Sequence, residues 1–487
     1  MDTASQMTGP SLARHQFVRR LTLGLTTAIM SILLASGCAL LDPSVPYGKA
    51  FEHALHDYAA TSRPARGATT RRATQTEEGP LTLANAIEIA LHNNPDLAAV
   101  GHGVDAAEAQ CDVAVGAILP KVNLEGGYTY FREERLIKPR RPGTLKVLGF
   151  TDELVTGDIV LTMPLYTGGR LQSQVTAAEL IARSRKQQLV RSRTELVFNV
   201  SSVFYSMLGH QQVINSMIFS RKALQEHHKL TKQMLDAQKA ARVDLLRTEV
   251  RLADIEQQII RERNTLNIKR FYLASLLGVS REGEPMHIEG TLELTDVPAS
   301  LAEGLATALA NRQDYQAAKS RVEAQAENLA IAESGRLPEL ALRASYGNRW
   351  AADAHNRNEV GQVGVLARIP VFEGGQIGAR VRAERSRLRA EKQHLRKLEL
   401  RIRLEVETAT SNIESTRARV GVTQKAAEQA KESLRIEREK YDLGKGAIVD
   451  VLDAQAALLN SQTNYYRALA DYNTALAQFR LAEGIQR

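Results

Sequence analysis

An internal duplication constrains the fold of this chain more than any other feature. The segment Leu83–Asp96 returns as Leu301–Asp314, 218 residues later. The segment Met163–Arg170 returns as Ile369–Gln376, at an offset of 206 residues that holds to the end of the repeat. The first copy therefore carries twelve extra residues between these two matches. A repeat of this length predicts a pseudo-symmetric architecture with length differences confined to loops.

The N-terminus has the pattern of a bacterial secretory signal. Three arginines precede an apolar run, Leu21–Ser36, which is too short for a membrane-spanning helix. The run ends in Ala-Ser-Gly-Cys38, which is similar to a lipoprotein box, and Ala39 favours the outer membrane as the destination. We therefore expect a signal peptide at residues 1–37, acylation of Cys38 and a Pro- and Thr-rich tether at residues 38–80.

Composition excludes several functional classes. The net charge is +8, but the arginines alternate with glutamates along helical patterns, which favours solvated helix faces over a nucleic-acid site. The only cysteines are Cys38 and Cys111, so acylation of Cys38 leaves no intrachain disulfide. The sequence holds no phosphate-binding loop, nucleophile elbow or metal-ligand cluster. We expect no enzyme activity, no cofactor and no metal.

Two long proline-free runs, 165–284 and 371–487, show apolar residues at helical spacing. One stripe is Leu395, Leu398, Ile402, Val406, Ala409 and Ile413. The pattern predicts long helices at 170–238 and 376–443 and shorter ones at 81–119, 244–277, 301–337 and 449–483. In each half the two short helices together have about the length of the long one, which indicates a rod of paired helices.

Four segments alternate with a period of two residues, the period of a β-strand. They lie at about 121–131, 155–165, 339–350 and 360–370, with apolar residues at every second position. An apolar face over about ten residues is typical of an outer-membrane strand. A soluble antiparallel sheet would show the same period, so the pattern leaves that alternative open.

Four transmembrane strands cannot close a barrel, because the smallest barrels have about eight. An open sheet edge in lipid leaves backbone groups without hydrogen-bond partners. If the strands cross the membrane, several chains must therefore share one barrel.

Three motifs resemble the TolC-type outer membrane efflux proteins. They are Pro164-Leu-Tyr-Thr-Gly-Gly169, Pro370-Val-Phe-Glu-Gly-Gly375 and the segment Tyr441–Gln455. The resemblance covers residues 81–487 and implies two family repeats, at 81–297 and 298–487. It also implies a mainly α fold in which three chains form a 12-stranded outer-membrane barrel and a periplasmic α-helical tunnel.

The resemblance implies specific site residues. Asp450 and Asp453 match the acidic rings that narrow the family's pore, and Tyr441 matches a tyrosine of its closing network. Gly446 stands where the family's archetype has an arginine, which puts that ion pair in doubt. From the residues alone, Asp450 is equally a helix cap after the glycine turn, and Asp244 fits a cap better than a pore ring.

The resemblance also implies partners at the ends of the helices. The turns that would contact a periplasmic adaptor comprise Lys239, Ala240, Ala241, Arg242, Gly444, Lys445, Gly446 and Ala447. The junctions between barrel and helices comprise Pro164, Gly168, Gly169, Pro370, Gly374 and Gly375.

The expected protein is the passive exit duct of a tripartite efflux system for small molecules, a homotrimer in the outer membrane lipid of a Gram-negative bacterium. It would work with an adaptor and an inner-membrane pump and without nucleic acid. Two alternatives are the exit duct of type I protein secretion and a periplasmic coiled-coil scaffold or adaptor. The sequence does not identify the cargo.

Overall fold

The computed structural model describes residues 80–136, 150–238, 241–280, 286–295, 301–351 and 357–485. These residues form two compact units, which we describe separately. One contains most of the β-strands, and the other contains the helices together with the strand ends that lead into them. The expected signal peptide, the tether and Cys38 lie outside the described residues.

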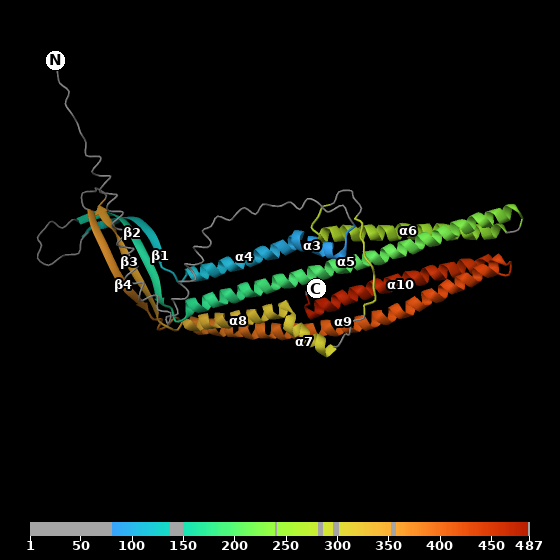
Figure 1. Ribbon diagram of the computed structural model, residues 1–487. Helices are drawn as coiled ribbons and strands as arrows, with labels where there is room; N and C mark the ends of the chain where they lie inside the picture. Colours follow the sequence, from blue (N-terminus) through green and yellow to red (C-terminus); the bar gives the residue numbers. More distant parts are fainter. Residues whose placement is uncertain are drawn as a thin grey trace, which may run out of the picture. The chain divides into compact units, whose positions relative to one another are not determined.

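The strands form a four-stranded sheet in the order β1-β2-β3-β4 (Figure 1). Their bounds are β1 Lys121–Leu136, β2 Phe150–Tyr166, β3 Glu339–Ala351 and β4 Arg357–Arg368. The first two strands extend beyond the alternating segments seen in the sequence, and β4 ends before Pro370. Proline has no N–H to donate to a neighbouring strand, which is a physical reason for that end.

The register of β1 and β2 places their apolar residues on one face. Leu124 lies opposite Ile159, and Tyr128 lies opposite Val155. Directly opposed residues point to the same side of an antiparallel pair. Leu124 is 82% exposed, so this apolar face is open in the single chain.

A glycine permits the close approach of β2 and β3. A Cβ at Gly347 would lie 2.2 Å from the carbonyl oxygen of Gly157, a distance that no real side chain accepts. Trp350, three residues further along β3, lies against Gly157. This part of the sheet therefore requires glycine on β3.

Two helices of 67 residues dominate the helical unit, α5 Arg170–Asp236 and α9 Gln376–Asp442 (Figure 1). At 1.5 Å per residue each is about 100 Å long. The partner helices are α6 Arg242–Leu276, which packs on α5, and α10 Ile448–Glu483, which packs on both α9 and α5. No helix in the described part of the chain is both long and apolar enough to span a bilayer.

The core follows the apolar stripes seen in the sequence. Ile402, Val406, Ala409 and Ile413 of α9 are all at most 3% exposed. They pack with Tyr472, Leu476 and Phe479 of α10 in one apolar cluster. The corresponding cluster of the first repeat joins α5 to α6 and α3 through Val200, Phe204, Met207 and Leu273. These clusters confirm the predicted mainly α, duplicated fold.

The helices expected at 81–119 and 301–337 are each broken, and this corrects the sequence interpretation. The first divides into α3 Leu83–Asn93 and α4 Pro95–Gly116, the second into α7 Leu301–Asn311 and α8 Gln313–Ser334. At the first break the Asn94 side chain accepts a hydrogen bond from the Leu97 N–H and donates one to the Leu276 carbonyl, both 2.9 Å. At the second break Arg312 donates to the carbonyl of Ala482. Helical periodicity continues through both breaks and hides them, although Pro95 at the start of α4 is a local signal for the first break.

Candidate pore-closing site

The turn between α9 and α10 begins this site. The α9 helix ends when the Lys445 N–H donates to the Lys440 carbonyl at 2.8 Å, with Gly444 at a positive φ of 71°. This arrangement suits glycine because other residues pay a steric cost in that conformation. A Cβ at Gly446 would lie 3.1 Å from both the Cβ of Lys440 and the nitrogen of Tyr441. The turn is therefore tight at the position where the family's archetype has an arginine.

Asp450 and Asp453 lie on one exposed face of the first turns of α10. The intervening Val451 and Leu452 are buried, which directs both carboxylates away from the core. A spacing of three residues places them on the same side of the helix. This geometry is consistent with the match of both aspartates to acidic rings, which the family resemblance implies.

Asp450 is not the N-cap of α10. The N-cap is Ala447, and Asp450 stands at the third helical position, where its Oδ2 accepts from the Ala447 N–H at 3.4 Å. Alanine has no side-chain acceptor, so the bond is not reciprocated as in a full capping box. Asp244 has the equivalent place in α6, whose N-cap is Ala241. The capping interpretation was wrong in position for both aspartates.

Asp453 has a partner that the sequence did not indicate. Nη2 of Arg251, on α6, donates to Oδ1 of Asp453 at 3.0 Å. Both side chains are about half exposed. The contact joins the tips of the two repeats within one chain. The only sequence signal for it is the offset of 206 residues, which aligns the start of α6 with the start of α10.

Tyr441 packs against α5. Its ring meets the ring of His227 edge to face, with 5.5 Å between centroids. Its hydroxyl approaches the sulfur of Met234 at 3.8 Å. Burial, with the charges of Asp244 and Asp442, raises the pKa of Tyr441. Tyr441 therefore joins the end of α9 to α5 by packing.

His227 is a functional candidate that the sequence patterns did not indicate. Its Nε2 is buried and has no hydrogen-bond partner among the described residues. Burial and the charge of Arg438 lower the pKa of His227. Its neighbour His228 instead contacts Glu249 of α6, so the two histidine rings lie against different helices.

A chain of polar contacts crosses the bundle next to Tyr441. Arg438 of α9 donates to the side-chain oxygen of Gln455 on α10 at 3.0 Å, and Gln455 donates to Ser220 of α5 at 3.0 Å. Gln455 and Ser220 are buried. Arg438 and Gln455, together with Tyr441 and His227, border a cleft of about 370 Å³. The three helices are thus tied together by directional bonds as well as apolar packing.

Six of the eight predicted adaptor-contact residues lie at the ends of the two helical hairpins. Ala241, Arg242, Gly444, Lys445, Gly446 and Ala447 occupy the ends of α6 and the turn before α10. Lys239 and Ala240 lie outside the described residues. Within the described residues no group of acidic, histidine and cysteine side chains is arranged to hold a metal ion.

The junction glycines repeat the same backbone geometry in both halves. Gly168 and Gly169 have φ values of 62° and 83°, and Gly374 and Gly375 have 58° and 80°. Each pair lies four and five residues after a proline, Pro164 or Pro370, and directly precedes a 67-residue helix. A Cβ at Gly168 would also lie 2.7 Å from that of Leu337.

Comparison with known proteins identifies the family. The family model for outer membrane efflux proteins matches residues 86–279 and 304–484. The chain belongs to the outer membrane efflux protein family. It is therefore an outer-membrane channel protein, as the sequence motifs predicted.

Individual relatives agree with this placement. The outer membrane protein TolC of Vibrio cholerae serotype O1 is 24% identical over 413 residues, covering 82% of this chain and 90% of the relative. The proteases secretion protein PrtF of Dickeya chrysanthemi is 23% identical and covers 78% of this chain and 83% of its own. The crystal structure of VceC from Vibrio cholerae has the same fold, with a TM-score of 0.70 at 19% identity, over 82% of this chain and 96% of that one.

Proposed function

We propose that the protein is the passive exit duct of a tripartite efflux system for small molecules. The observation that carries the proposal is a sheet of only four strands with an exposed apolar face. In this sheet β1 and β4 are edge strands of the described chain. In lipid such edges need partners, and further copies of the chain supply them. Three copies give twelve strands.

We propose that the helices of three chains form the tunnel of this duct. Symmetry would bring Asp450 and Asp453 of three chains around one axis and form two stacked acidic rings. Rings of carboxylates attract cations and repel anions at a constriction. Tyr441, packed on His227, would hold the α9–α10 turn in its closed position.

The tips of the α5–α6 and α9–α10 hairpins would bind a periplasmic adaptor, which connects the duct to an inner-membrane pump. Support comes from the short turns and the exposed side chains of Leu443 and Val243, which are 71% and 49% exposed. Exposed apolar residues at a hairpin tip are typical of a contact surface. The duct itself would catalyse no reaction and supply no energy.

Planar-bilayer recording of the purified assembly tests this function. The wild-type protein should give cation-selective channels that trivalent cations block. Asp450→Asn combined with Asp453→Asn should weaken both properties, and Asp471→Asn, elsewhere on α10, should leave them unchanged. Light scattering in detergent should give the mass of three chains. A stable monomer with intact secondary structure would contradict the proposal.

A second candidate is the exit duct of type I protein secretion, since one relative is named a proteases secretion protein. Deletion of the gene separates the two. Small-molecule efflux predicts increased susceptibility to toxic compounds, and protein secretion predicts loss of a secreted protein from the medium. Membership of the efflux protein family argues against the soluble scaffold.

We also propose that Cys38 is acylated and anchors the chain in the outer membrane. The support is the sequence Ala-Ser-Gly-Cys38 after an apolar run. Mass spectrometry of the mature protein should find a diacylglycerol and an amide-linked fatty acid on Cys38. A free amino group at another residue would contradict this.

A further inference from the structure

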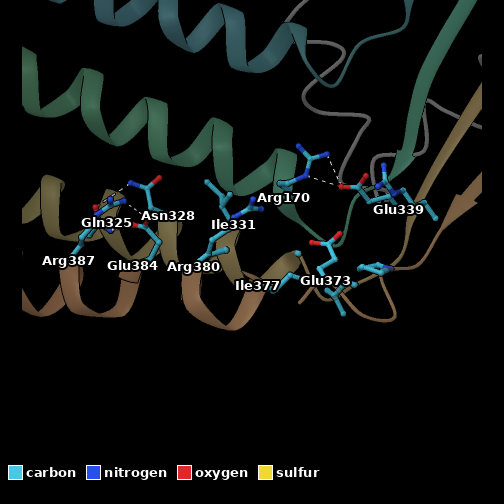
Figure 2. Close-up of a pocket in the computed structure, with 15 residues that line it drawn as sticks. Arg170, Gln325, Asn328, Ile331, Glu339, Glu373, Ile377, Arg380, Glu384 and Arg387 are labelled. Carbon is cyan, nitrogen blue, oxygen red and sulfur yellow. Dashed lines mark hydrogen bonds and ion pairs between the residues drawn. The ribbon is translucent and has the colours of Figure 1, made fainter. Parts of the chain in front are cut away.

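A polar cavity of about 670 Å³ lies where β3 and β4 lead into the helices, next to α8, α9 and the start of α5 (Figure 2). Its lining includes four arginines, Arg170, Arg368, Arg380 and Arg387. The pore-closing site does not involve this cavity.

Two of the arginines are already neutralised. Arg170 forms two bonds to Glu339, through Nε at 3.1 Å and Nη2 at 2.9 Å, as Figure 2 shows. Arg387 pairs with Glu384, which also accepts a hydrogen bond from Gln325 at 2.7 Å. The carboxylates of these two pairs therefore each already have an arginine partner.

The other two arginines are exposed and have no partner within the described residues. They are Arg368, the last residue of β4, and Arg380, one turn into α9. One carboxylate that lines the cavity, Glu373, likewise has no partner in the part of the chain that the structure describes. The α9 helix begins beside them with Gly375 as N-cap and no side-chain cap, so its N-terminal N–H groups add positive potential. The cavity has an excess of positive charge.

The fold does not require these arginines, because the first repeat builds the same elements without them. The residues 206 positions earlier than Arg368, Arg380 and Arg387 are Thr162, Gln174 and Ile181. The excess charge extends along this half of α9. Residues 376–403 contain ten Lys and Arg against three Glu, whereas residues 404–442 contain seven against eight acidic residues. The charge is therefore concentrated near the strands.

The same segment exposes apolar side chains beside the arginines. Val371 and Phe372 are 94% and 87% exposed. In an outer-membrane protein, the end of a strand lies at the level of the lipid headgroups, where aromatic and basic residues gather. Basic pockets at that level bind phosphate headgroups.

We propose that this cavity binds the phosphate headgroup of an anionic phospholipid from the periplasmic leaflet. Arg368 and Arg380 contact the phosphate, and Val371 and Phe372 lie against the acyl chains. Arginine suits this role because its planar guanidinium matches phosphate oxygens in pairs. The site rests on the outer-membrane location and is independent of what the duct transports.

Native mass spectrometry of the delipidated, intact assembly tests the proposal with phosphatidylglycerol as the probe. Arg368→Gln combined with Arg380→Gln should weaken phosphatidylglycerol binding about tenfold or more, the scale expected for lost charge-assisted hydrogen bonds. The matched control is Arg389→Gln with Arg396→Gln, which removes two charges from α9 outside the cavity. It should change binding less than about twofold.

One further variant and one competitor test whether the cavity recognises the phospholipid. Glu373→Gln removes the unpaired carboxylate at an exposed position, so it should assemble normally and bind phosphatidylglycerol more tightly. Inorganic phosphate alone should compete poorly, because it lacks the acyl chains. Three results would overturn the proposal. The control pair could lose phosphatidylglycerol binding as strongly as the Arg368/Arg380 variant, or binding could stay unchanged in both the Arg368/Arg380 and the Glu373 variants. Inorganic phosphate could also bind as tightly as phosphatidylglycerol.

Discussion

Arg312 is the one charged side chain among the buried residues that the structure describes, and it is 1% exposed. It pairs with Asp314 at 2.7 Å and with Glu405 of α9. Burial alone would raise the pKa of Asp314, but the hydrogen bond and charge of Arg312 lower it. The first repeat has Asn94 at the equivalent break. The two repeats therefore place different side chains, a neutral amide and a charged guanidinium, at the same helix break.

Arg312→Ala should destabilise the helical unit by about 3–5 kcal/mol, because it leaves two carboxylates without their buried partner. Arg435→Ala, which removes an exposed α9 arginine with two glutamate partners, should destabilise the protein much less, because water screens exposed ion pairs. Urea unfolding followed by circular dichroism measures both. Similar costs for the two variants would mean that the Arg312 network contributes no more than surface pairs.

The environment of His227 predicts that the stability of the tip formed by the ends of α5 and α9 depends on pH. The pKa of a histidine in an unfolded chain is about 6.5, and burial with the Arg438 charge lowers it in the folded protein. A lowered histidine pKa means that stability is full above about pH 6.5 and falls as the pH drops below that value. Asp442 opposes the shift but does not reverse it.

Hydrogen exchange around Tyr441, expressed as protection factors, should show the tip opening more at pH 5.5 than at pH 7.5. His227→Phe keeps a ring against Tyr441 and should abolish this difference, while His228→Phe should retain it. If His227→Phe responds to pH as the wild type does, another group controls the tip.

At the scale of elements, the register of β1 and β2 divides the sheet into two chemically different faces. Val122 and Leu124 lie opposite Leu161 and Ile159. The intervening Asn123 lies opposite Val160, which is 3% exposed. One face is thus exposed and apolar, and the other carries polar residues with a local buried contact.

Leu124→Arg and Leu161→Arg should therefore reduce assembly much more than Asn123→Arg. A charge on the lipid face costs about 2–4 kcal/mol near the bilayer midplane. The fraction of heat-modifiable oligomer on gels measures assembly. Equal losses at all three positions would show that the face assignment is wrong.

At the scale of the whole molecule, the Arg251–Asp453 pair connects the two repeats at their tips. A half-exposed pair of this kind contributes about 0.2–1 kcal/mol. Threefold symmetry, as proposed, would repeat the contribution three times around the entrance. The pair would therefore influence an equilibrium between closed and open tips although it is weak in one chain.

Arg251→Ala should increase the open probability of single channels in planar bilayers several-fold and strengthen block by trivalent cations, because Asp453 loses its counter-charge. Arg247→Ala is the matched control, since Arg247 contacts Asp244 of its own helix at 3.7 Å. If both variants gate alike, the contact between repeats does not hold the entrance.

The sequence by itself determined the duplication, the four strands, the long helices and the family motifs. These features depend on local sequence patterns, namely periods of two or about 3.6 residues and glycine turns that recur at a constant offset. Asp450 and Asp453 came from the resemblance of the segment Tyr441–Gln455 to the family, and their spacing of three residues predicts that they share a helix face.

Only the tertiary structure decided the break at Arg312, the partners of Asp453 and Tyr441, and the arginine-lined cavity. At the two breaks the side chains of Asn94 and Arg312 donate to carbonyls 182 and 170 residues away. Arg251 meets Asp453 across 202 residues. Such contacts depend on which helices become neighbours, and helix periodicity specifies an apolar face without specifying the residue that will lie opposite it.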